Sequence, residues 1–125
     1  MTSEEFGTEK QTLIQQVREL HDVDDKQAVE ATITRLKCLN YMPIFIIETQ
    51  NFFALTKADI LKEIERLSNL TDAEMIEAGF SLDRDFLNLK ITQMRLLVYH
   101  FRLLLRLRND EADAWDEIDE LYTDD

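Results

Sequence analysis

Turn-forming residues are scarce in this sequence: two glycines and one proline occur among 125 residues. A β-sandwich or a β-barrel of this length needs many tight turns, and Gly and Pro supply a large share of them. The shortage therefore favours helices joined by a small number of loops. We predict an all-α fold, a compact bundle of five to six helices with short loops plus acidic terminal segments.

The spacing of apolar residues and the capping residues locate the expected helices. Leu13, Ile14, Val17 and Leu20 form one stripe on a helix from Thr8 to His21. Asp24 or Asp25 caps the next helix, "TDAE" at 71–74 has the spacing of a capping box, and Gly79 ends the helix that follows it. Ser81 is the expected cap of the longest helix, which runs from about Leu82 to Arg108.

The stretch "NYMPIFIIETQNFF", residues 40–53, reads locally like a buried strand. A strand needs a partner, and no second β-rich run exists in the sequence. Proline is favoured at the first position of a helix, where its missing N–H has no bond to lose. We therefore expect a short helix over Pro43–Gln50 that is buried on nearly all sides, with Ile44 and Ile47 in the core.

Charge is distributed unevenly along the chain, whose net charge is −12. Residues 110–125 contain nine carboxylates and no Lys or Arg, whereas residues 26–108 contain twelve bases and ten acids, a net of +2. We expect an acidic N-terminal segment at 1–8, a bundle domain at 9–108 and an acidic tail at 109–125. Such acidity argues against non-specific binding of nucleic acid.

No catalytic or metal-binding motif is present, so we expect no enzyme and no cofactor. His21 and His100 lie far apart, and His100 is expected to be structural or partly exposed. Cys38, the single cysteine, is expected to be a buried, inert thiol and favours a reducing compartment. No apolar run is long enough to span a membrane, and the acidic first ten residues do not resemble a signal peptide.

Residues 12–108 carry a pattern that resembles the N-terminal domain family of transcription elongation factor S-II, and within it the integrase-binding domains. The pattern begins with a hydrophobic–Asp pair (Val23–Asp24), a "V…I..L..L" helix from Val29 to Leu39 and the Pro43–Ile44 entry into a short helix. It continues with "L.KI.R" before a second loop, matched by Leu61, Glu63–Ile64 and Arg66–Leu67, and with "VYHFRLLLR" near the end of the last helix. Phe101–Arg102 stand where the elongation factors have a Trp–Lys pair. The stretch between Leu67 and the last helix is longer than in the family.

The resemblance implies a scaffold domain that binds disordered acidic–aromatic motifs of transcription and chromatin regulators, in the nucleus. It implies no direct contact with nucleic acid or membrane, and a monomer or a subunit of a complex. The partner-binding residues that it implies are Val23, Asp24, Leu67, Leu70, Phe101 and Arg102. Asp24 would accept a peptide N–H, and Leu67 and Leu70 would bury the aromatic ring. Val23 and Leu67 as core-edge residues and Asp24 as a plain N-cap remain alternatives.

Two other classes of function remain open. An acidic inhibitor or decoy of a basic partner, of the immunity-protein or DNA-mimic kind, would need ordered carboxylates on the folded body. The other class is a structural subunit of a larger complex, in which the long helix is buried against partner subunits. If the resemblance does not hold, the expected location is cytoplasmic. The tail is either a solvated acidic end or a short helix that folds back, with Trp115 and Ile118 on the bundle and its carboxylates towards Arg102, Arg106 and Arg108.

Overall fold

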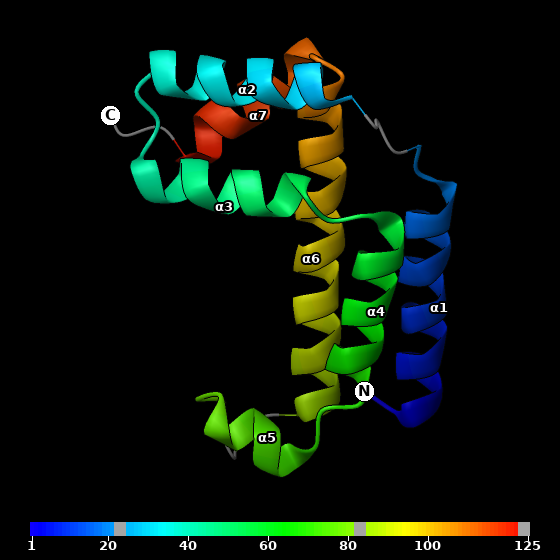
Figure 1. Ribbon diagram of the computed structural model, residues 1–125. Coiled ribbons are helices and arrows are strands. Elements are labelled where there is room, and N and C mark those ends of the chain that lie inside the picture. The colour runs from blue at the N-terminus through cyan, green and yellow to red at the C-terminus, as the bar shows by residue number, and fades with distance from the viewer. Residues whose placement is uncertain (22–24, 82–84, 123–125) are drawn as a thin grey trace. The chain divides into compact units, whose positions relative to one another are not determined.

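The computed structural model describes residues 1–21, 25–81 and 85–122, and over these residues the chain forms seven α-helices and no strand (Figure 1). The all-α prediction is therefore confirmed, with a helix count slightly above the expected five to six. The helices are α1 (Ser3–Glu19), α2 (Lys26–Cys38), α3 (Pro43–Phe53), α4 (Lys57–Ser68), α5 (Asp72–Glu77), α6 (Phe86–Arg108) and α7 (Ala112–Tyr122). Among the described residues, none of these helices is long and apolar enough to cross a membrane.

The chain divides into two compact units, and both include an acidic end of the sequence. Unit 1 consists of Met1–Leu20 and Lys57–Tyr99, and unit 2 consists of His21–Thr56 and His100–Asp125. The long helix α6 contributes its first part to unit 1 and its last part to unit 2. Helix α1 begins at Ser3, and α7 packs within unit 2, so residues of both acidic ends belong to these units.

In unit 1, α1 lies against α4, and both pack with the first part of α6. The predicted stripe of α1 is buried at Leu13, Ile14 and Val17. Ion pairs connect α1 to both of these helices. Lys10 Nζ lies 2.8 Å from Glu65 Oε1 of α4, and Arg95 Nη2 of α6 lies 3.0 Å from Glu9 Oε2. Lys57 Nζ donates to the carbonyl of Arg18 at 2.8 Å, which satisfies one of the last carbonyls of α1.

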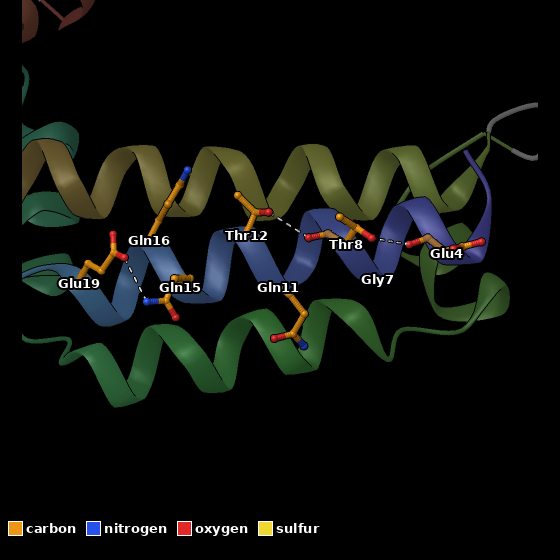
Figure 2. A pocket seen from close by; sticks show the side chains of 8 residues that line it. All are labelled: Glu4, Gly7, Thr8, Gln11, Thr12, Gln15, Gln16 and Glu19. Carbon is orange, nitrogen blue, oxygen red and sulfur yellow. Dashed lines mark hydrogen bonds between the residues drawn. The ribbon is translucent and has the colours of Figure 1, made fainter.

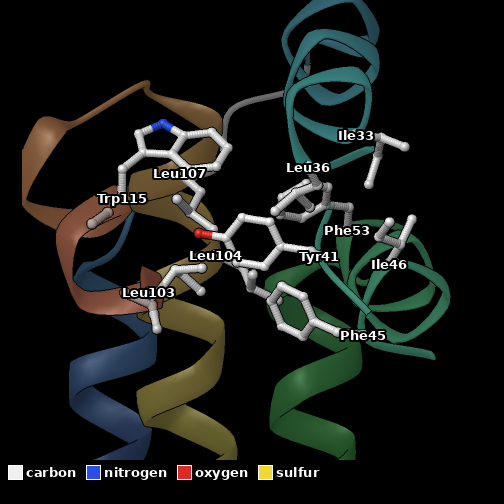
Figure 3. Packing of buried hydrophobic residues seen from close by; sticks show 12 residues of the cluster. Ile33, Leu36, Tyr41, Phe45, Ile46, Phe53, Leu103, Leu104, Leu107 and Trp115 are labelled. Atoms are coloured by element: carbon white, nitrogen blue, oxygen red, sulfur yellow. The ribbon is translucent and has the colours of Figure 1, made fainter. Parts of the chain in front are cut away.

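Unit 2 is built around a continuous apolar cluster from α2, α3, the end of α6 and α7. Figure 3 shows these side chains converging from the four helices and from the loop that carries Tyr41. Tyr41 and Phe45 lie with their ring centroids 5.7 Å apart. The cluster contains Ile33, Leu36, Tyr41, Phe45, Ile46, Phe53, Leu103, Leu104, Leu107, Ala114, Trp115 and Ile118.

The expectation that α3 is buried on nearly all sides is wrong. Pro43 begins the helix as predicted, and Phe45, Ile46, Thr49 and Phe53 are buried. Ile44 and Ile47, however, are 64% and 56% exposed. Four consecutive residues of a helix are spread around its whole circumference, so a helix packed on one face leaves some members of any such run in solvent.

Capping residues at the helix starts agree with the predictions in two cases and differ in one. Asp25 caps α2 by accepting from the N–H groups of Gln27 and Ala28, and Thr71 forms the expected capping box with Glu74. The expected cap Asp24 lies outside the described residues. Helix α6 begins at Phe86, where Asp85 accepts from the Leu87 N–H at 3.0 Å, rather than after Ser81.

Cys38 is exposed, which corrects the expectation of a buried thiol. The buried residues of α2 are Thr32, Ile33 and Leu36, which share one face of the helix. Position 38 follows Leu36 by two residues and therefore faces roughly the opposite direction.

Candidate protein-interaction site

A pocket of about 510 Å³ lies in unit 1, between the end of α4, helix α5 and the first part of α6. It contains both leucines, Leu67 and Leu70, that the sequence pattern singled out. Leu67 is in the last turn of α4, and Leu70 follows in the loop to α5. The full lining consists of Arg66, Leu67, Leu70, Glu74, Met75, Glu77, Ala78, Phe80, Lys90 and Gln93.

Helix α5 is held in place by strong local signals at both ends. Its capping box pairs the Thr71 side chain with the Glu74 N–H, while the Glu74 carboxylate accepts from the Thr71 N–H at 3.3 Å. At its other end, Gly79 has a φ of 98° and donates its N–H to the carbonyl of Ile76, and Phe80 donates to that of Met75. This is a Schellman motif, which places the residue after the glycine back against the helix.

The apolar part of the pocket consists of Leu67, Leu70, Met75 and Phe80. Met75 is 1% exposed and anchors α5, whereas Leu67, Leu70 and Phe80 are half-buried. These three side chains still expose apolar surface to water around an open pocket. An aromatic or aliphatic side chain of a partner would therefore gain contact area here.

Two cations, Arg66 and Lys90, line the same pocket. Arg66 Nε lies 2.9 and 3.0 Å from the two carboxylate oxygens of Glu63, and this guanidinium lowers the pKa of the Glu63 carboxyl. Lys90 is half-buried, and no carboxylate of the described residues lies within ion-pair distance of its ammonium. Two carboxylates, Glu74 and Glu77, also line the pocket, and Glu74 accepts hydrogen bonds from Thr71. An apolar base with the half-buried Lys90 beside it suits a segment that combines an aromatic ring with a carboxylate placed at Lys90.

The structure brings together only two of the six partner-binding residues expected from the sequence. Val23 and Asp24 lie outside the described residues. Phe101 is 1% exposed and belongs to the core of unit 2, where its ring centroid lies 6.2 Å from that of Phe52, so its ring is not a binding surface. Arg102 is exposed on α6 within unit 2.

Sequence reasoning did not identify Met75, Phe80, Lys90 or Gln93 as neighbours of the two leucines. The capping box and Gly79 predicted the limits of α5, and the Schellman pattern could have placed Phe80 on Met75. Lys90 and Gln93 carry no such signal, because their presence depends on how α6 packs on α4 and α5.

In unit 2, residues 112–122 of the acidic tail form helix α7, which packs on the unit. Its buried face consists of Ala114, Trp115 and Ile118, and Arg106 lies 3.3 Å from both Glu111 and Glu117. The back-folded alternative is therefore the observed one for Trp115, Ile118 and Arg106. Arg108, in contrast, is buried beneath the Phe53 ring and donates to the carbonyl of Phe53.

The outward face of α7 is acidic. Asp113, Asp116 and Glu120 are exposed, and their positions at i, i+3 and i+7 place them on one face of the helix. Tyr41, from the loop after α2, donates its hydroxyl to Asp119. Burial, together with Asp119, raises the pKa of the Tyr41 hydroxyl, so this donor keeps its proton at physiological pH.

A shallow polar surface follows one side of α1 (Figure 2). The hydroxyls of Thr8 and Thr12 donate to the carbonyls of Glu4 and Thr8, each at 3.1 Å, and Gln15 donates to Glu19 at 3.1 Å. These polar groups are occupied within the helix itself. The face contains no Lys or Arg and is a solvated surface.

Within the described part of the chain, no cluster of His, Cys, Asp or Glu side chains has the arrangement of a metal site. Comparison with protein-family models, with curated proteins and with solved structures finds no match to this chain.

Proposed function

We propose that this chain is a non-enzymatic protein-interaction domain that binds short acidic–aromatic segments in the pocket of unit 1. The observation that carries the proposal is the composition of that pocket, in which Leu67 and Leu70 adjoin Phe80 and the cations Arg66 and Lys90. By the resemblance to the elongation-factor family, the partners would be disordered regions of transcription or chromatin regulators, and the location would be the nucleus.

In this proposal the aromatic ring of the segment covers Leu67, Leu70 and Phe80, and a neighbouring carboxylate pairs with Lys90. Burial of the ring supplies most of the free energy, because exposed ion pairs are worth only about 0–1 kcal/mol each. Lys90 contributes more than an exposed cation would, since it is half-buried and the ring would shield it further from water. Arg66 would have to leave Glu63 to take part, so its contribution is smaller.

Helix α7 supports the proposal by chemical analogy within the same molecule. It is an acidic–aromatic segment, and unit 2 holds it by burying Trp115 while Arg35 and Arg106 pair with carboxylates of residues 110–117. Apolar burial flanked by arginine–carboxylate pairs is thus a stable arrangement in this chain. The pocket of unit 1 offers the same two kinds of contact.

The test is the anisotropy of a fluorescein-labelled peptide, with a phenylalanine between acidic residues, titrated with the full chain at physiological salt. We expect Lys90→Glu to weaken binding at least about tenfold, since charge-assisted bonds contribute roughly 1.5–3 kcal/mol. Arg102→Glu is the matched control, because it makes the same change of net charge at an exposed position in unit 2. Leu67→Ala should also weaken binding about tenfold.

Equal losses for Lys90→Glu and Arg102→Glu would indicate general repulsion and would contradict a site in unit 1. Circular dichroism of each variant separates loss of binding from loss of fold.

A second candidate function is favoured by the order of α7. A decoy for a basic partner needs carboxylates fixed on a folded surface, and Asp113, Asp116 and Glu120 meet that requirement. Binding of a lysine-rich peptide that is lost in the Asp113→Asn, Asp116→Asn, Glu120→Gln variant, but kept in Lys90→Glu, would support the decoy. Binding of the acidic peptide that is lost in Lys90→Glu, but kept in the Asp113→Asn, Asp116→Asn, Glu120→Gln variant, would support the first function.

A further inference from the structure

A small cavity of about 70 Å³ lies within unit 2, between α3, α6 and α7. It shares no residue with the pocket of unit 1, so it is independent of the proposed function. Five of its eight lining residues are apolar, and the other three are Glu48, Thr49 and His100. The apolar members are Phe45, Phe52, Leu103, Leu104 and Ile118.

The hydroxyl of Thr49 is the unusual group in this cavity. Thr49 is 2% exposed, and among the described residues its Oγ1 has no hydrogen-bond partner. The other buried threonine, Thr32, donates its hydroxyl to the carbonyl of Ala28 at 2.8 Å. Buried hydroxyls nearly always have a partner in native proteins, because leaving one unpaired is unfavourable. A buried, unpaired hydroxyl on a cavity wall therefore points to an absent ligand atom.

The other polar residues suit an uncharged ligand. His100 is half-buried, and burial lowers the pKa of its imidazole, an effect that the nearby Glu48 carboxylate opposes. The imidazole is therefore mainly neutral at physiological pH, with one nitrogen that donates and one that accepts. It offers no fixed positive charge to an anion.

We propose that this cavity binds a short aliphatic group that carries a single hydroxyl or carbonyl oxygen, with that oxygen at Thr49 and its carbons against Phe45, Leu104 and Ile118. The cavity has about half of the roughly 150 Å³ that accommodates a benzene ring, which is room for three or four non-hydrogen atoms. A single water at Thr49, with His100 or Glu48 as further partners, would fill only about half of the cavity, since a water takes up roughly 30 Å³, and it would leave the apolar side of the wall without contacts.

The test uses 1-propanol as the probe and the full chain labelled with ¹⁵N and with ¹³C at its methyl groups. Titration should produce saturable shifts at Phe45, His100 and Ile118, with a dissociation constant in the millimolar range. Thr49→Val keeps the shape of the side chain and removes the hydroxyl, so it should weaken propanol binding about fivefold. Thr32→Val, the matched control in α2, should leave binding unchanged.

Three results would overturn the proposal: shifts that grow linearly without saturation, equal affinity in wild type and Thr49→Val, or nuclear Overhauser contacts from long-lived water to Thr49 that persist in propanol. A variant that fails to fold does not affect the decision, because xenon provides a second measurement on the wild type. Xenon should shift the methyl signals of Ile118, as propanol does, and should compete with propanol for the cavity. Absence of that competition would also contradict a shared apolar cavity.

Discussion

The guanidinium of Arg35, on α2, lies over the indole of Trp115, on α7, with its central carbon 4.0 Å from the ring centroid. The same carboxylate oxygen, Asp110 Oδ1, accepts from Arg35 Nη1 and from Trp115 Nε1, each at 3.0 Å. The three residues therefore satisfy each other's polar groups while the ring is buried. Within unit 2, this triad fixes the start of α7 on α2.

Trp115 should emit as a buried indole. The ring is 5% exposed, and it is the single tryptophan of the chain, so we expect a blue-shifted emission maximum and weak quenching by iodide, even when salt screens the acidic tail. Arg35→Met should shift the emission towards that of a solvated indole, whereas Lys37→Met, on an exposed side chain of the same helix, should not. Ready quenching of the wild type would mean that α7 is not docked in solution.

Ile46 and Ile47 are neighbours in sequence, but a charge should destabilise the chain strongly at the first position and hardly at the second. Ile46 is 8% exposed, so Ile46→Asp buries an unpaired carboxylate and should cost several kcal/mol of unfolding free energy. Ile47 is 56% exposed, so Ile47→Asp should change stability by about 0.5 kcal/mol or less. Urea unfolding followed by Trp115 emission measures both, and similar costs at the two positions would contradict the observed face of α3.

Replacement by valine should change the stability of the ligand-free chain differently at the two buried threonines, Thr32 and Thr49. Thr32→Val loses a hydrogen bond and should destabilise the chain by about 1 kcal/mol. Thr49→Val removes a hydroxyl that has no partner among the described residues, so it should be neutral or stabilising. Thermal melting of the two variants side by side gives the comparison. A larger loss for Thr49→Val would mean that its hydroxyl already has a partner.

His100 should make unit 2 less stable in mild acid. Its pKa in the folded chain is lowered from 6.5, mainly by burial, so the unfolded chain binds the proton more readily. Its full contribution to stability is present above pH 6.5 and is lost as the pH falls from there through the folded pKa. Urea unfolding between about pH 7.5 and 5.5, above the range of most carboxylates, should show this loss in wild type and in His21→Gln. His100→Gln should reduce the slope, and an unchanged slope would exclude His100 as its source.

The features that the sequence determined by itself are local. Asp25, the Thr71–Glu74 box, Pro43 and Gly79 each act on backbone groups within a few residues, so their positions alone predicted where helices begin and end. The apolar spacing of Trp115 and Ile118 likewise indicated which face of α7 would be buried if the tail folded back, because residues three apart lie on the same side of a helix.

Only the tertiary structure decided which apolar residues meet the core. Ile44 and Ile47 are as hydrophobic as Phe45 and Ile46, and their exposure depends on where α2, α6 and α7 lie around α3. The packing of the helices likewise places Phe101 in the core and brings Lys90 to Leu67 and Leu70, which lie 23 and 20 positions earlier in the chain. Burial depends on how all the helices pack, whereas a helix cap depends on about four adjacent residues. Sequence patterns therefore predict caps far better than they predict burial.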